Sequence, residues 1–234
     1  MKIVQICGNA KSGKSYFTAK LINKLSDLGF ESIKLSYSTP LKKILKNLGI
    51  TKLNLNNKIK YSSFKDFLNC LFKELKNFLN IYSYKKISES DLYTYLNINI
   101  KKLKEAYKLY FEEKQNYIGF RLFAQTIGTD IIRKIDKDIF VNILFQKVKD
   151  ISCLSFINFI IIDDWRFENE DLSRFKSDLN FDIIKVKISS KKAGGEEYYS
   201  HISENEFKKF KVDFVVKYDK IDKEIDNILY KIFK

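Results

Sequence analysis

The sequence predicts an α/β fold, in which a doubly wound, mainly parallel five-stranded sheet is flanked by helices and carries a helical insertion. Short β-type runs alternate with helical patterns along most of the 234 residues, and a glycine-rich turn joins the first run to the first helix. Residues 51–118 contain neither Gly nor Pro and show helical apolar spacing, which predicts an insertion outside the sheet.

The first forty residues predict a strand, a turn, a helix and a second strand. Residues 3–7 form a β-type run, and residues 14–28 place apolar side chains at helical spacing before a stop signal at Gly29. Residues 32–36 then form the second strand. Two strands joined by a helix imply a parallel pair with a right-handed crossover.

The remainder alternates helices and strands around the insertion. Pro40 is well placed at a helix start, and the helix over 41–48 closes at Gly49. We expect one domain, 1–234, with the insertion at 51–118. Its later elements should be helices at 121–134, 138–149, 168–177 and 221–233, and strands at 158–163, 181–188 and 212–216.

Composition narrows the class of protein. Hydrophobic residues make up 45% and charged residues 31% of the chain, which excludes both intrinsic disorder and a membrane span. The net charge is +14, but only four of the 43 basic residues are Arg. Lys spread along helices usually forms a solvated face, so nucleic acid is a disfavoured partner.

The three cysteines have no paired spacing and no signal peptide is visible, so we expect a reducing compartment, the cytoplasm.

Residues 8–15 carry the strongest chemical signal. They match the phosphate-loop pattern G-x-x-x-x-G-K-[ST] in full, between a predicted strand and a predicted helix. In such a loop backbone N–H groups surround a phosphate, the Lys14 ammonium reaches the β and γ oxygens, and the Ser15 hydroxyl binds Mg²⁺. We therefore predict a P-loop NTPase fold that binds ATP. The ATP-binding residues would be Gly8, Asn9, Ala10, Lys11, Ser12, Gly13, Lys14, Ser15 and Tyr16.

A phosphate loop also needs a carboxylate at the end of a neighbouring strand, to hold Mg²⁺ directly or through water. Asp163 and Asp164 follow the apolar run 159–162. Physical reasoning does not decide between them. For both, the alternative to metal binding is a structural role as a polar strand end or helix cap. Arg166 lies two residues beyond Asp164, at the mouth of the predicted site.

A further group of polar residues recurs at near-helical spacing along 121–134. Gly128 lies among them and costs about 1 kcal/mol relative to Ala inside a helix. Its presence predicts that something approaches the backbone closely there, and the alternative is a surface helix with a break at the glycine. The group consists of Arg121, Gln125, Thr129, Asp130 and Arg133.

Several motifs occur in a fixed order from residue 3 to about 216, with only the helical insertion unmatched. They are the phosphate loop, Ser-Thr-Pro-Leu-Lys at 38–42, Gln-Thr-Ile-Gly-Thr-Asp at 125–130, Asp-Lys-Asp-Ile-Phe-Val at 136–141, Asp-Trp-Arg-Phe-Glu-Asn-Glu at 164–170 and His-Ile-Ser-Glu at 201–204. Together they resemble the phage-type deoxynucleoside monophosphate kinases. The chain departs from that family's usual pattern at Thr39, where an Asp is common, and at 191–195, where Arg-Pro-Gly is common.

The resemblance implies Mg²⁺-dependent transfer of the γ-phosphoryl group of ATP to a deoxynucleoside monophosphate, for DNA precursor synthesis, in the host cytoplasm if the source is viral. It makes Lys14, Asp164 and Arg166 the catalytic residues, and Ser15, Asp164 and Asp163 the metal candidates. It implies a mobile lid at 189–202 that carries Lys191, Lys192 and His201. The alternative for His201 is that it orients that loop and the capping box beside it. The substrate-binding residues would be Lys42, Arg121, Gln125, Thr129, Asp130, Arg133, Asn169 and Glu170.

Two rival functions stay open. A dephospho-CoA kinase-like or other small-molecule P-loop kinase would share the phosphate loop, but not the motifs at 125–130 and 164–170. A nucleic-acid-binding P-loop NTPase is less favoured, because the net charge is its sole support. We expect no membrane partner. The sequence does not decide between a monomer and a homodimer.

Overall fold

The computed structural model describes residues 1–52, 61–175, 181–190, 202 and 205–233. The chain divides into two compact units, and each is described by itself. The first unit comprises residues 1–37 and 141–234, and the second comprises residues 38–140.

The first unit is built on a five-stranded parallel sheet in the order β2-β3-β1-β4-β5. The order reverses at β1, so the predicted doubly wound arrangement is confirmed. β1 and β3 are neighbours, and Ile162 at the end of β3 lies opposite Gln5 of β1. In such sheets ligands bind beyond the carboxyl ends of the strands. The strands are β1 (Lys2–Gly8), β2 (Ser32–Leu35), β3 (Phe159–Ile162), β4 (Asp182–Ser189) and β5 (Phe214–Lys217).

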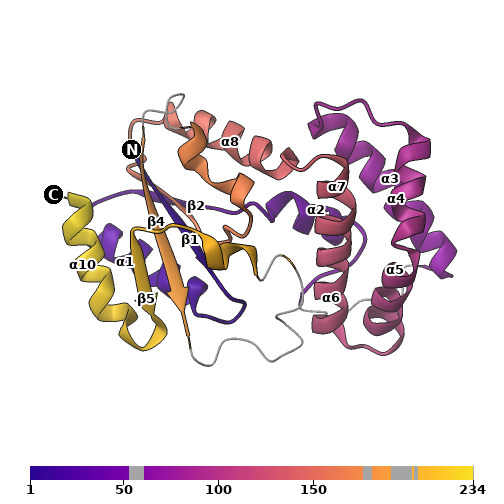
Figure 1. Ribbon diagram of the computed structural model, residues 1–234, viewed down its shortest axis with the longest axis horizontal. Coiled ribbons are helices and arrows are strands. Elements are labelled where there is room, and N and C mark those ends of the chain that lie inside the picture. Colours follow the sequence, from indigo (N-terminus) through magenta and orange to yellow (C-terminus); the bar gives the residue numbers. More distant parts are fainter. Residues whose placement is uncertain (53–60, 176–180, 191–201, 203–204, 234) are drawn as a thin grey trace. The chain divides into compact units, whose positions relative to one another are not determined.

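Helices cover both faces of this sheet (Figure 1). Helices α1 (Lys14–Asp27) and α10 (Ile221–Phe233) pack on the face that carries Val4 and Ile6. Helix α8 (Ile139–Ser152) packs with Val141, Leu144 and Val148 on the opposite face. Because side chains alternate along a strand, buried residues on both faces produce the continuous apolar runs of the sequence.

The second unit is helical. Its helices are α2 (Thr39–Asn47), α3 (Phe64–Tyr82), α4 (Glu89–Ile98), α5 (Ile100–Tyr107), the π-helix η1 (Lys108–Glu112), α6 (Asn116–Gln125), the π-helix η2 (Thr126–Ile132) and α7 (Arg133–Ile135). Ser63 caps α3 by accepting the Asp66 N–H, and Ser88 and Asp91 form a capping box on α4. The expected insertion, 51–118, therefore contributes helices to a helical unit that also includes α2, α6 and α7.

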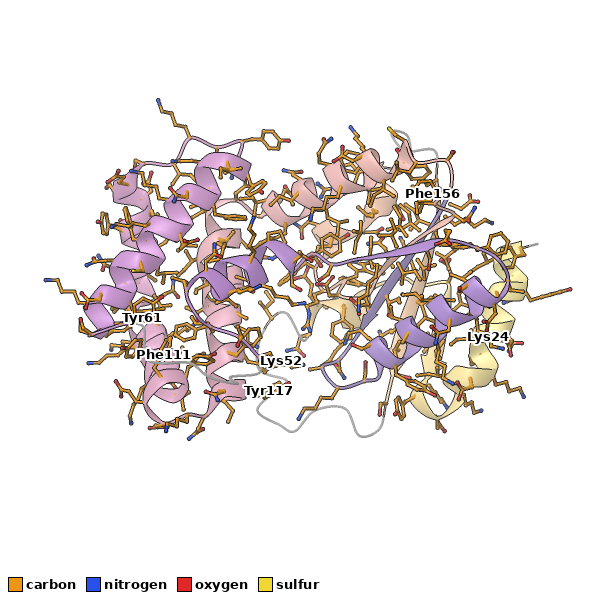
Figure 2. All side chains as sticks on the ribbon, turned by 180° about the vertical axis from the view of Figure 1, so that it is seen from behind. Lys24, Lys52, Tyr61, Phe111, Tyr117 and Phe156 are labelled. Carbon is orange, nitrogen blue, oxygen red and sulfur yellow. The ribbon has the colours of Figure 1, made fainter. Side chains whose placement is uncertain are left out.

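Aromatic side chains fill the core of this unit. The Tyr61 ring packs edge-on against Phe67 and Phe111, and both of these contact Phe123 of α6. Figure 2 labels Tyr61 and Phe111 in this cluster, together with Lys52, whose ammonium lies 5.8 Å from the ring centre of Tyr117. Burial also raises the pKa of the Tyr61 hydroxyl, which donates to the Leu48 carbonyl.

Two predicted helices differ from the structure. The helix expected at 121–134 is one continuous run, but its middle is the π-helix η2. The α-helix expected at 168–177 was wrong, since the described part consists of two 3₁₀ turns, η3 (Glu168–Glu170) and η4 (Leu172–Phe175). There, side chains take the backbone N–H groups that an α-helix would use internally, as when Asp171 Oδ1 accepts the Ser173 N–H.

Candidate active site

The phosphate loop connects β1 to α1 and turns through left-handed backbone conformations. Gly8 and Gly13 have φ values of +147° and +98°. A Cβ at Gly8 would lie 2.4 Å from the Ile188 carbonyl oxygen, and a Cβ at Gly13 would lie 2.3 Å from the Tyr218 ring. Both positions therefore need glycine for conformation and for space.

The Lys14 ammonium lies over this loop. Its Nζ donates to the carbonyl oxygens of Gly8, at 2.8 Å, and Asn9, at 2.5 Å. Among the described residues no side chain caps the N-terminus of α1, and its first turn carries no acidic residue. The partial positive charge of that helix end is therefore left for an anion.

Two buried polar atoms lie in the loop, and one of them, the Ser12 hydroxyl, suits a phosphate ligand. Asn9 Oδ1 and Ser12 Oγ have no hydrogen-bond partner within the part of the chain that the structure describes. A buried hydroxyl without a partner is costly, and Ser12 can donate to an oxyanion. Ser15 is exposed in the first turn of α1. The residues present thus fit the phosphates of a nucleotide.

Tyr16 follows on the same helix and contacts residues that come after β5. Its ring centre lies 6.1 Å from that of Tyr218, and its hydroxyl lies 3.4 Å from both carboxylate oxygens of Asp222. The Tyr218 ring in turn covers Gly13. Tyr16 is therefore next to the loop, and its contact with ATP stays a prediction.

Cys7 is the last buried side chain before the loop. Burial raises the pKa of its thiol to about 11, against the opposing charges of Lys187 and Lys14. The thiol therefore stays neutral at physiological pH and acts as a small apolar side chain, as the sequence predicts.

The two carboxylates after β3 have different partners. Asp163 is buried, and its Oδ2 lies 2.5 Å from Lys34 Nζ on the neighbouring strand β2. Asp164 is half-buried, and its carboxylate accepts hydrogen bonds from the Ser36 hydroxyl, at 2.5 Å, and the Tyr37 N–H, at 2.9 Å. Asp163 is thus paired with a cation, whereas these two bonds to Asp164 come from neutral donors.

The turn that carries Arg166 is held by Glu170. The Glu170 carboxylate is 1% exposed and accepts the backbone N–H groups of Arg166, at 2.7 Å, and Phe167, at 3.1 Å. Arg166 and Asn169 are half-buried beside it. The structure thus occupies the Glu170 carboxylate with backbone groups, although the resemblance implies substrate binding there.

Two residues of this region were missed by the sequence reasoning. Gln5 is fully buried in β1 and bonds to Tyr37, at the end of β2, and to the Glu170 turn. The available signal was an amide inside the apolar run 3–7. For Tyr37 the sequence offers no signal that separates it from the other tyrosines.

The structure brings Lys14, Asp163, Asp164 and the Arg166 turn to the carboxyl edge of the first unit's sheet. The other predicted substrate residues lie in the second unit. Lys42 is exposed on α2, and the rest are half-buried along the run from α6 to α7. In this run Asp130 pairs with Lys102 at 2.8 Å, and the Arg133 guanidinium lies 5.0 Å from the ring centre of Phe140.

Gly128 lies in the π-helix of this run and approaches Leu41 of α2. A Cβ at Gly128 would lie 2.6 Å from Leu41 Cδ2, so the close approach expected at this glycine is confirmed. π-Helical segments are frequent at functional sites. The lid residues Lys191, Lys192 and His201 lie outside the described residues.

Comparisons with known proteins bear on the whole chain. A family model described as deoxynucleotide monophosphate kinase matches residues 2–232. A search of the curated proteins found no match. Among solved structures, a mutant of the APS kinase CysC from Mycobacterium tuberculosis is 12% identical with a TM-score of 0.40, and the alignment covers 100% of this chain and 97% of that one. The two chains share so few residues that this likeness says nothing of individual site residues.

Proposed function

Because this chain belongs to the deoxynucleotide monophosphate kinase family, we propose that its phosphate loop and the side chains after β3 transfer the γ-phosphoryl group of ATP to a deoxynucleoside monophosphate. The observation that carries the residue assignment is the pairing of β1 with β3. β1 leads into the loop, and β3, which ends beside Gln5 of β1, leads into the two carboxylates. The product would be the corresponding diphosphate.

The acceptor requires little chemical activation. A phosphate monoester carries close to two negative charges at neutral pH, since its second pKa is about 6, so its oxygen is already a nucleophile. The barrier to transfer is the repulsion between two anions. The protein has to bring donor and acceptor into line and neutralise the charge on the transferring group.

Lys14 and the loop would bind the donor. The loop N–H groups, the uncapped end of α1 and the Ser12 hydroxyl would surround the β-phosphate, and Lys14 would move from the loop carbonyls to the β and γ oxygens. We propose that Ser15 and Asp164 hold Mg²⁺. When bound, this ion neutralises the negative charge on the phosphate oxygens.

The ion pair of Asp163 supports Asp164 as the metal carboxylate. Lys34 already neutralises Asp163. The Ser36 hydroxyl and the Tyr37 N–H orient the Asp164 carboxylate. A carboxylate that is already paired with an ammonium, as Asp163 is, is the poorer ligand for Mg²⁺.

Arg166 would bind the oxygens between donor and acceptor, because a planar guanidinium can hold two of them at once. Glu170 fixes the backbone of the Arg166 turn, so we assign it to positioning. We assign acceptor binding, as the family resemblance implies, to Asn169, Lys42, Arg121, Gln125, Thr129, Asp130 and Arg133. A lid at 189–202 would exclude water, which would otherwise hydrolyse ATP.

The cellular setting is also a proposal. Cys7, Cys70 and Cys153 are free, which suits a reducing compartment such as the cytoplasm. None of the described helices is long and apolar enough to span a membrane.

A coupled assay tests the proposed function. The purified chain is incubated with ATP, Mg²⁺ and each deoxynucleoside monophosphate in turn, and formation of ADP and of the new diphosphate is measured. Dephospho-CoA serves as a second acceptor, and ATP hydrolysis with and without DNA is measured in parallel. Transfer to at least one deoxynucleoside monophosphate supports the proposal. Transfer to dephospho-CoA alone, or hydrolysis that requires DNA, would contradict it.

A further inference from the structure

Gln5 is the polar residue at the centre of β1, the strand that the sheet order places in the middle. Its side chain is 0% exposed and lies on the same face as the buried Ile3 and Cys7. An amide costs free energy when it leaves water, unless the protein satisfies its hydrogen bonds. An apolar residue would pack this strand without that cost, so the amide calls for a physical explanation.

Both polar atoms of the amide are used. Gln5 Nε2 donates to the Tyr37 hydroxyl at 3.0 Å and to the Glu170 carbonyl oxygen at 2.9 Å. Gln5 Oε1 accepts the Leu172 N–H at 3.0 Å. The Tyr37 hydroxyl donates to the same Glu170 carbonyl at 2.5 Å. One side chain thus joins β1 to Tyr37, the second residue after β2, and to the turn after β3.

Each partner also holds a group of the transfer site. The Tyr37 N–H donates to Asp164 Oδ1 at 2.9 Å. The Glu170 carboxylate fixes the N–H of Arg166 at 2.7 Å. Tyr37 therefore connects the Gln5 amide to Asp164, and Glu170 connects it to Arg166.

We propose that Gln5 is a positioning residue for phosphoryl transfer, which sets Asp164 and the Arg166 turn relative to the phosphate loop through Tyr37 and Glu170. This rests on the proposed function of the same site. A fully satisfied buried network is rigid, and Gln5 lies three residues before Gly8, on the strand that ends in the loop. Strand β1 thus carries the phosphate loop and, through Gln5, also fixes Asp164 and the Arg166 turn.

The first test is Gln5→Leu, compared with Ile228→Ala as a matched control. Ile228 is fully buried in α10 on the opposite face of the sheet, so its truncation destabilises the same unit without touching the network. For Gln5→Leu we expect kcat to fall roughly tenfold or more, with KM for ATP and monophosphate within about threefold, because small misplacements at the reacting atoms act on the transition state. Ile228→Ala should lower the melting temperature and leave kcat of the folded enzyme unchanged.

The second test is Tyr37→Phe, which keeps the ring and removes the hydroxyl. We expect it to lower kcat alone, and to have little further effect in the Gln5→Leu background, because both changes break one network. Additive effects of the two substitutions would overturn the proposal. Tyr37→Phe also keeps the proposal testable if Gln5→Leu does not fold.

Trp165 gives a readout that does not depend on activity. It is the only tryptophan of the sequence, it is 1% exposed in the turn after β3, and its indole N–H donates to the Phe167 carbonyl at 3.0 Å. Its emission should shift to longer wavelength in folded Gln5→Leu and not in Ile228→Ala. Unchanged emission together with unchanged kcat would overturn the positioning role. A wild-type chain that phosphorylates no monophosphate would instead contradict the proposed function.

Discussion

The ammonium of Lys34 on β2 lies 2.5 Å from the carboxylate of Asp163, the first residue after β3. This pair distinguishes two adjacent carboxylates that physical reasoning from the sequence leaves equivalent. Asp163 is buried and neutralised by Lys34, while Ser36 and the Tyr37 N–H orient Asp164. Because of this difference, we expect substitutions of the two carboxylates to have different effects.

Asp164→Asn should lower kcat roughly 100-fold at saturating Mg²⁺, because it removes the negative charge that we assign to the metal. Asp163→Asn should affect kcat far less and should lower the free energy of unfolding by about 1 kcal/mol, since the Lys34 side chain is 44% exposed and can turn to water. Steady-state kinetics and urea unfolding of both variants measure this. The reverse ranking of kcat would move the metal to Asp163.

Lys14→Ala should abolish phosphoryl transfer while the chain stays folded, because the ammonium contacts loop carbonyls and not the core. The matched control is Lys20→Ala on the same helix, which removes an exposed lysine paired with Asp222. Circular dichroism checks the fold, and the coupled assay checks transfer. An active Lys14→Ala enzyme would contradict the phosphate-loop assignment.

Arg166→Lys should lose about 2–4 kcal/mol of transition-state stabilisation, seen as a fall in kcat with little change in KM for the monophosphate. A lysine keeps the charge but meets two phosphate oxygens only as a point charge. Arg174→Lys is the control, since the Arg174 guanidinium lies 4.6 Å from the ring centre of Phe175 in η4. Equal turnover of both variants would place Arg166 outside the site.

Cys7 should make the stability of the chain fall at high pH. Its pKa is raised from 9.0 to about 11 in the folded state, so the unfolded chain releases this proton first. The contribution is complete below pH 9 and is lost between pH 9 and 11, by up to about 3 kcal/mol. Cys7→Ala should lack this part of the pH dependence. Equal slopes for both proteins in urea unfolding from pH 8 to 11 would refute the burial effect.

Gly119→Ala should destabilise the chain more than Gly128→Ala, although both glycines lie in one helical run. A Cβ at Gly119 would lie 2.7–2.9 Å from the Tyr110 Cβ, backbone nitrogen and Cα, and these atoms cannot move independently. We expect a loss of about 2–3 kcal/mol there. At Gly128 the neighbour is the tip of Leu41, and Ala gains about 1 kcal/mol of helix propensity, so the net change should stay within about 1 kcal/mol. Thermal melts of both variants compare the losses.

The features predicted from the sequence are those set by local patterns. The phosphate loop, α1, α10 and the parallel strands follow from residue spacing and from glycines in fixed places. Strand order was beyond prediction, because it depends on pairing between segments as distant as β1 and β3.

The parts of the site that escaped prediction depend on tertiary contacts. Gln5 reads as one amide in an apolar strand until Tyr37 and Glu170 are brought beside it. The π-helix at Thr126–Ile132 likewise has no local sequence pattern of its own, whereas a close approach to the backbone at Gly128, though not its partner Leu41, could be inferred from the glycine. A glycine inside a helix predicts by itself that something packs closely against the backbone. A buried amide gives such information only when its hydrogen-bond partners are known.

The central place of β1 in the sheet has a consequence for synthesis of the chain. Its neighbours β3 and β4 begin at Phe159 and Asp182, so β1 leaves the ribosome with neither edge paired. At about 5–20 residues per second, roughly 8–30 s pass before β3 is made. The helical unit Ser38–Phe140 is synthesised within that interval. The apolar strand that ends in the phosphate loop is thus exposed to chaperones and to other nascent chains longer than any other strand of the sheet.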